Sequence, residues 1–260
     1  MTKIIIATHK KYEMPDYKCY LPLFVGAEGK DPIGFTADNT GENISTKNPS
    51  YCELTGLYWA WKNLDADYIG LVHYRRHFSL KSRSFIKRNG VFKSVLSDKE
   101  VEELTREYDI ILPKKRQYYI ETVYSHYKHT MHIEPLDTTR QVIEDLFPDY
   151  LPYFDRHMKN RGGHMFNMFI MKKEVLDSYC NWLYEVLGEV EKRTDSSSYD
   201  SFHRRFFGRL SERLLDVWIA RWGYSYTEVP VISTEPVNWL KKGSSFLLAK
   251  FTGKKYGKSF

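Results

Sequence analysis

An apolar segment that ends in a cluster of cationic side chains constrains this chain more than any other feature. Residues 68–72 (Tyr-Ile-Gly-Leu-Val) have the length and character of a strand buried on both faces of a sheet. Four basic or titratable side chains follow it closely: His73, Arg75, Arg76 and His77. Ligands of α/β proteins usually bind where such strands end, and the planar donor forks of arginine suit phosphate or carboxylate. The segment therefore predicts an anion site, which we interpret as a diphosphate site.

Strand-like and helix-like segments alternate along the rest of the chain. The expected strands are residues 3–8, 21–26, 68–72, 109–113, 166–171 and 226–232. The expected helices are residues 53–63, 97–108, 138–147, 151–158, 173–192 and 206–222. Such alternation is typical of an α/β fold with a mostly parallel, doubly wound sheet flanked by helices. We expect a single domain over residues 1–236.

The charge of the chain is concentrated at its C-terminal end. Of 39 basic residues, six lysines and no acid fall in residues 237–260, so the rest of the chain is balanced against its 33 acids. Nucleic-acid binding normally needs a basic face on the folded body, which argues against that class. The basic, aromatic-containing tail is interpreted as a segment that binds an anionic membrane surface, with a solvated terminus as the alternative.

The cysteine pattern and the hydropathy indicate a cytoplasmic protein. The three cysteines (Cys19, Cys52 and Cys180) show no pair spacing, which favours a reducing compartment. No signal peptide precedes residues 3–6, and no apolar run approaches the roughly 20 residues of a membrane span. We expect a cytoplasmic location, with peripheral attachment to the inner face of the cell membrane if the tail binds lipid.

Six short motifs, in this order, resemble a bacterial family long labelled only as a domain of unknown function. They are Thr8-His9-Lys10, residues 43–48, residues 53–63, His73-Tyr74-Arg75-Arg76, residues 167–171 and residues 211–214. The resemblance extends from about residue 2 to residue 235. Members of that family occur in gene clusters for capsule, exopolysaccharide and O-antigen, and they are regarded as glycosyltransferases.

The resemblance implies a GT-A-like fold, a nucleotide-sugar donor, and a polysaccharide or lipid-linked acceptor. Some members resemble galactofuranosyltransferases that use UDP-galactofuranose. We therefore expect a glycosyltransferase that moves a sugar, galactofuranose in the first instance, from a UDP donor to a lipid-linked saccharide. A carbohydrate-binding or scaffold protein of the assembly machinery, without turnover, is the alternative.

The position that holds a metal motif in most GT-A enzymes carries cationic residues here. The motif Asp65-Ala66-Asp67 lies before the strand, at the opposite end from the usual metal site, and reads as a solvated turn. His73-Tyr74-Arg75 occupies the usual place. Arginines can stabilise a departing diphosphate directly. We expect no metal and no other cofactor, with Mn²⁺ or Mg²⁺ as the alternative.

The donor-binding residues are expected at strand ends and in the long polar loop. Asn and Asp in that loop could equally serve as turn or capping residues. The full set of expected donor or diphosphate contacts is Thr8, His9, Lys10, Asp38, Asn43, Asn48, His73, Arg75 and Arg76.

The catalytic group is expected to be a carboxylate. Family members use an α-linked donor, so a β product requires inversion and one general base for the acceptor hydroxyl. The candidates, in order, are Glu212, Glu53 and Asp200. Glu53 could instead complement the amino end of its helix.

Four further residues are expected to contact the acceptor or the donor: Trp59, His126, Asn167 and Arg213. Each has an ordinary alternative, since Trp59 could be a core ring and Asn167 a satisfied buried amide. His126 begins a 126/129/132 histidine spacing that could also suggest zinc, but the third histidine drifts off the helix face. A metal-dependent hydrolase built on these histidines is a second rival.

Overall fold

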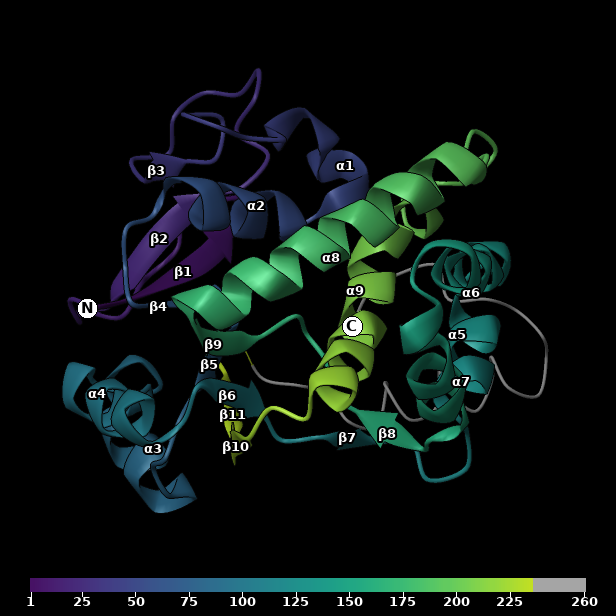
Figure 1. Cartoon of the computed structure of the whole chain (residues 1–260). Coiled ribbons are helices and arrows are strands. Elements are labelled where there is room, and N and C mark those ends of the chain that lie inside the picture. The colour runs from purple at the N-terminus through teal and green to yellow at the C-terminus, as the bar shows by residue number, and fades with distance from the viewer. Residues whose placement is uncertain (236–260) are drawn as a thin grey trace.

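The computed structural model describes residues 1–235, which form a central sheet with helices on both faces (Figure 1). The strands are β1 (Thr2–Thr8), β2 (Tyr20–Phe24), β3 (Thr36–Ala37), β4 (Tyr68–His73), β5 (Arg76–Phe78), β6 (Ile110–Pro113), β7 (Arg116–Gln117), β8 (Gly162–Gly163), β9 (Phe169–Lys172), β10 (Tyr226–Val229) and β11 (Val231–Ser233). The tail predicted at residues 237–260 lies outside the described residues, so its membrane role stays a prediction.

Nine α-helices lie within the described part of the chain. They are α1 (Asn48–Tyr51), α2 (Leu54–Asn63), α3 (Arg83–Asn89), α4 (Asp98–Glu107), α5 (Val123–Thr130), α6 (Glu134–Leu146), α7 (Leu151–Lys159), α8 (Lys173–Arg193) and α9 (Phe206–Trp222). Short 3-10 helices lie at Ser45–Lys47, Phe92–Ser94, Pro148–Tyr150 and His203–Arg205. No helix among residues 1–235 is long and apolar enough to cross a membrane.

The main sheet has the strand order β10-β6-β9-β4-β1-β2-β3. Strands β3, β2, β1 and β4 run parallel to one another, as do β6 and β10. Strand β9 lies between β4 and β6 and is antiparallel to both. The expected α/β sheet flanked by helices is confirmed. Strand β9 departs from a fully parallel order, as do β5, which pairs antiparallel with β4, and β11, which pairs antiparallel with β5.

The sheet buries apolar side chains on both faces, as the β-branched run of β1 requires. Ile5 and Ala7 pack into the larger core with helices α2, α8 and α9, and Figure 1 shows α8 crossing over this face. Ile4 and Ile6 point the other way, into a second core that includes Val101 of α4. Helices α5, α6 and α7 gather beside α9, away from β1 (Figure 1).

Most expected elements are present, but the region around residue 166 differs. The helix expected at 53–63 is α2, and the helix expected at 97–108 is α4, which begins with a capping box between Ser97 and Glu100. The strand expected at 166–171 begins only at Phe169, because Phe166 and Asn167 have positive φ angles of 79° and 52°. That backbone conformation ends regular pairing and turns the chain sharply before β9.

Asp38, expected to contact the donor, instead organises the long polar loop. It is fully buried, and its carboxylate accepts hydrogen bonds from the backbone N–H groups of Gly26 (2.8 Å) and Ala27 (3.0 Å). The hydroxyls of Ser45 (2.5 Å) and Thr55 (2.6 Å) donate to the same carboxylate. With four donors engaged, Asp38 has no capacity left for a ligand. It fixes the chain on either side of the loop.

We expect Asp38→Ala to lower the free energy of unfolding by about 3 kcal/mol or more, because four buried donors lose their acceptor at once. Denaturant titration measures this directly. Asn39→Ala is the matched control, because Asn39 is exposed in the same loop, and a change within about 0.5 kcal/mol is expected there. A loss below about 1 kcal/mol for Asp38→Ala would show that the loop does not depend on this carboxylate.

Candidate functional site

A cleft of about 990 Å³ opens at the carboxyl ends of β1 and β4. Thr8 and His9 line it from the end of β1, and His73 to Arg76 line it from the end of β4. Helix α9, the segment between α1 and α2, and the loop after β7 form the other walls. The position is the one that the apolar strand 68–72 predicts, because carboxyl ends of neighbouring parallel strands meet at one edge of the sheet.

The charge of the cleft is strongly positive. Its lining contains six arginines, Arg75, Arg76, Arg116, Arg205, Arg209 and Arg213, against two carboxylates, Glu53 and Glu212. Such an excess of guanidinium groups is suited to a polyanion such as a diphosphate. Carboxylate ligands, which a divalent cation would need, are outnumbered.

Three of these arginines, Arg116, Arg205 and Arg209, were missed from the sequence. Arg205 and Arg209 recur at four-residue spacing with Arg213, which was expected to contact the acceptor or the donor, and this spacing places the three along one side of α9. That spacing is the signal that sequence reasoning could have used. Arg116 belongs to the two-residue strand β7, and nothing in its local sequence indicates a site.

The two arginines after β4 differ in how firmly they are held. The guanidinium of Arg76 stacks on the ring of Phe166, with 4.5 Å between guanidinium carbon and ring centroid. Burial, together with the neighbouring charge of Arg75, lowers the pKa of Arg76. Arg75 is 42% exposed and lies 3.4 Å from the carboxylate of Glu235. Arg76 is therefore the better fixed of the two donors.

Strained backbone is concentrated at the cleft. Within residues 1–235, four non-glycine residues have positive φ: Cys52, Tyr119, Phe166 and Asn167. The first three line the cleft, and Asn167 follows directly. Such conformations cost free energy and typically persist where the surrounding structure uses them at functional sites.

Asn167 joins two walls of the cleft. Its side-chain amide donates to Glu53 Oε1 (2.7 Å) and to the carbonyl of Gly208 in α9 (3.0 Å). The amide oxygen of Asn167 is buried and has no partner among the described residues. Glu53 is thereby oriented through one oxygen, while its Oε2 accepts no hydrogen bond from the described part of the chain. A carboxylate with one fixed and one free oxygen can accept a proton from a ligand.

Glu212 is engaged through both oxygens. The Phe166 N–H donates to Oε1 (3.0 Å), and Oε2 lies 3.5 Å from Arg213 and 3.6 Å from Arg209. Burial acts to raise the pKa of Glu212, but the two arginines and the Phe166 N–H outweigh it and hold the pKa below its usual value. A carboxylate stabilised in its charged form is a weak proton acceptor, so Glu53 is better placed than Glu212 to act as a base.

The predicted residues divide into those that the cleft brings together and those that lie elsewhere. Lining it are Thr8, His9, Asn48, Glu53, His73, Arg75, Arg76, His126, Glu212 and Arg213, with Asn167 behind Glu53. Outside its lining are Lys10, Asp38, Asn43, Trp59 and Asp200. The indole N–H of Trp59 donates to Thr40, and the ring is buried as a core residue.

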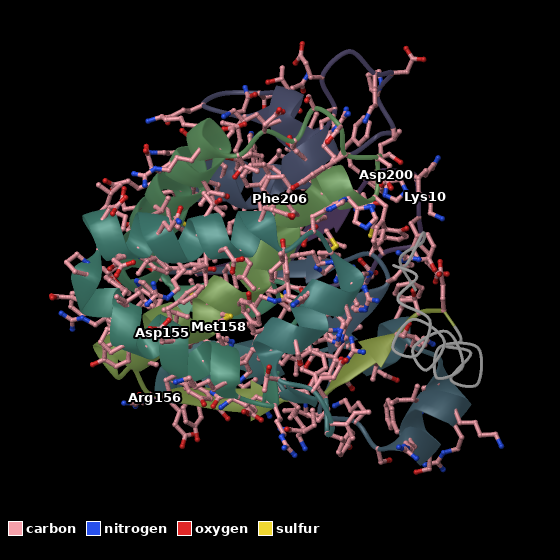
Figure 2. All side chains as sticks on the ribbon, turned by 90° about the vertical axis from the view of Figure 1, so that its right-hand side faces the viewer. Lys10, Asp155, Arg156, Met158, Asp200 and Phe206 are labelled. Carbon is pink, nitrogen blue, oxygen red and sulfur yellow. The ribbon has the colours of Figure 1, made fainter. Side chains whose placement is uncertain are left out.

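Asp200 caps a turn rather than facing the cleft. Its carboxylate accepts from the backbone N–H groups of Phe202 (2.8 Å) and His203 (2.9 Å) and contacts the His203 ring. These backbone bonds and the His203 side chain lower the pKa of Asp200 to about 2. Figure 2 shows Asp200 and Lys10 at the edge of the molecule.

The histidines do not form a metal site. His126 and His129 both contact buried Glu121 through Nδ1, at 2.9 and 2.6 Å, while His132 stacks on Tyr199. Among residues 1–235 no three His, Cys, Asp or Glu side chains are grouped to hold a metal ion. Asp67 contacts the N-terminal amine at the start of β4, away from the cleft.

Comparison with known proteins identifies the family. Residues 3–222 match a family described as Domain of unknown function (DUF4422). The chain belongs to this family. No curated protein matches it. The resemblance found from the six sequence motifs is therefore confirmed.

One solved structure is similar in sequence and fold. It is the apo structure of WbbM, described as a bifunctional glycosyltransferase, with 29% identity and a TM-score of 0.82. The match covers 90% of this chain and 45% of that chain, so the family domain corresponds to less than half of WbbM. The fold of a glycosyltransferase is thus shared.

Proposed function

We propose that this family domain is a glycosyltransferase whose donor is a nucleoside diphosphate sugar. The observation that carries the proposal is the cleft at the carboxyl ends of β1 and β4, where six arginines surround one carboxylate with a free oxygen. The likeness to the WbbM glycosyltransferase supports the same activity. The arginines suit departure of a diphosphate from a sugar, and the carboxylate suits activation of an acceptor hydroxyl.

The arginines act on the leaving group. When the bond between the anomeric carbon and the diphosphate oxygen breaks, negative charge builds up on the diphosphate. Arg76, stacked on Phe166, is preorganised to meet that charge, and the α9 arginines add further donors. The arrangement supports metal-independent transfer, because guanidinium groups supply the countercharge that Mn²⁺ or Mg²⁺ supplies in other enzymes.

Glu53 acts on the acceptor. Its free Oε2 takes the proton of the acceptor hydroxyl while that oxygen forms the new bond to the anomeric carbon. The proton ends on Glu53 and the diphosphate leaves as UDP, so charge and atoms balance. Asn167 holds the other oxygen at 2.7 Å and is a positioning residue. Attack opposite the leaving group inverts the anomeric configuration.

The finer parts of the proposal rest on the family. Its members' occurrence in capsule, exopolysaccharide and O-antigen clusters supports a lipid-linked saccharide as the acceptor. The likeness of some members to UDP-galactofuranose-dependent enzymes supports UDP-galactofuranose as the donor. A cleft of about 990 Å³ has room for a UDP-sugar together with the end of an acceptor.

A donor panel tests the activity. Purified protein is given UDP-sugars, UDP-galactofuranose included, with a saccharide acceptor, and UDP release is measured with and without EDTA. We expect release from one donor and no loss with EDTA. Release that EDTA abolishes would contradict metal independence. Binding of saccharide without affinity for UDP or any UDP-sugar would overturn the proposal in favour of a carbohydrate-binding protein.

We expect Arg76→Ala to lower turnover by about 10²-fold, as removal of a preorganised donor to a leaving group does in other enzymes. Arg76→Lys should recover part of the loss, because it keeps the charge but not the fork. Arg204→Ala is the matched control, since Arg204 is exposed and outside the cleft lining. Equal turnover in Arg76→Ala and Arg204→Ala would remove the diphosphate role of Arg76.

We expect Glu53→Gln to lower turnover by about 10²-fold or more with little change in KM, because the amide cannot accept the proton. The acidic limb of the pH–rate profile should disappear as well. Glu42→Gln, outside the cleft, is the control. If Glu212→Gln removes the acidic limb and Glu53→Gln leaves it, the base is Glu212 instead.

A further inference from the structure

Beside the cleft, the loop after β7 presents apolar side chains to solvent. Tyr119 is 78% exposed and Ile120 is 58% exposed, the largest exposures of apolar side chains among residues 2–235. Tyr119 also has a positive φ of 59°. The chain therefore holds two adjacent apolar side chains outward, at the tip of a loop, although burial would be favourable for both.

The loop is held in a defined position by the segment before β8. The Tyr118 N–H donates to the Arg161 carbonyl (2.7 Å), and the Val123 N–H donates to the Asn160 carbonyl (2.8 Å). The guanidinium of Arg161 donates to the Tyr119 carbonyl (3.2 Å). Strands β7 and β8 pair next to these contacts. The exposed tip is thus a built feature of the fold.

The surroundings of the tip are basic. Residues 113–120 and 159–162, which the β7–β8 pairing brings together, contain five cations and no acid. A second hollow of about 390 Å³ lies here, and Lys115, Arg156 and Arg161 line it. Arg156 lies at the edge of the molecule in Figure 2. Among residues 1–235, Asp216 is the one acid that lines the hollow, and His164 binds it through a backbone and a ring nitrogen.

The hollow also contains an unsatisfied donor or acceptor. His157 lines it, is 5% exposed, and its Nε2 has no hydrogen-bond partner among the described residues. The nearest acid, Asp216, is 3.8 Å away. A buried polar atom of this kind can bond to a ligand that enters the hollow. Three cations and one free imidazole nitrogen fit a phosphate group.

We propose that the loop tip (Tyr119 and Ile120) and the cationic hollow (Lys115, Arg156 and Arg161) form a docking surface for an anionic lipid bilayer. The tip inserts among the lipid headgroups, and the hollow receives the phosphate of one lipid. Apolar side chains beside a cationic surface are the combination that binds such membranes. Arg116, Gln117 and Tyr119 also line the cleft, so docking brings its mouth to the bilayer.

This placement connects the surface to the proposed function. A lipid-linked acceptor presents its sugar just above the headgroups, where the mouth of the cleft would lie. That connection rests on the glycosyltransferase proposal, whereas lipid binding itself does not. Vesicle binding is measured without donor or acceptor, so its failure and the failure of transferase activity are separate results.

The test is cosedimentation of the full chain with vesicles of phosphatidylglycerol and phosphatidylcholine, and with phosphatidylcholine alone. We expect binding to the anionic vesicles only. Ile120→Glu should weaken it by about tenfold or more, because a carboxylate replaces the inserted apolar group. Arg156→Glu should weaken it by at least about fivefold, since each basic charge near an anionic surface contributes about that factor.

Matched controls lie at helices α3 and α4, which are far from β8 in Figure 1. Leu80 is 52% exposed and precedes α3, and Arg106 is 72% exposed on α4. Leu80→Glu and Arg106→Glu should bind vesicles like the unchanged chain. Ile120→Glu should keep its turnover on soluble substrates. Unchanged vesicle binding in Ile120→Glu and Arg156→Glu, or no binding by the unchanged chain, would overturn the proposal.

Discussion

Three walls of the cleft, the end of β4, the segment between α1 and α2, and helix α9, are tied to two consecutive residues, Phe166 and Asn167. Asn167 donates to Glu53 and to Gly208, while the Phe166 N–H donates to Glu212. The Phe166 carbonyl contacts His73 at the end of β4, and its ring supports Arg76. These contacts need the left-handed backbone at both positions, since an extended strand would point one of the two side chains away. The strain at these residues is therefore balanced by the contacts that define the site.

The second constraint on the site is its excess of positive charge. Six arginines converge on one cleft, and Glu53 and Glu212 neutralise only part of their charge. Glu212 lies between Arg209 and Arg213 and keeps these two side chains near each other, which their mutual repulsion alone would oppose. The remaining repulsion favours any bound polyanion, because a ligand that pairs with the arginines also stabilises the folded chain.

The sequence predicted the location of the cleft better than the residues that line it. Residues 68–72 end at the cleft because a strand that is apolar on both faces has to lie inside the sheet. The cations that follow this strand then have to lie at the rim of the sheet. The arginines of α9 and Arg116 reach the same place only through tertiary packing. Asp38 is a polar loop residue of the kind that often binds a ligand, yet its carboxylate already accepts hydrogen bonds from four donors of the chain. Short-range sequence cannot distinguish these two uses of a carboxylate.

The antiparallel strand β9 was also beyond prediction. Its length and apolar residues fit either direction. The direction depends on which edge of the sheet the chain reaches after α7. In the structure, β9 starts at the rim beside His73, so the turn at Phe166 and Asn167 stands next to the ends of the parallel strands. A parallel β9 would have carried these residues to the opposite edge. The order of catalytic candidates changed for a related reason, since hydrogen-bond partners of Glu53 and Glu212 come from distant parts of the chain.

The contacts of Asn167 set when the cleft can form during synthesis. Its partners are 114 residues earlier and 41 residues later in the chain, and His73 is 93 residues from Phe166. Closing such long loops is entropically costly and slow compared with forming local helices and strands. A nascent chain that has not yet released α9 can build β1, β2 and β4 but lacks the carbonyl that anchors Asn167. The arginine-lined cleft is thus a late product of folding, which keeps an incomplete chain from presenting a finished site.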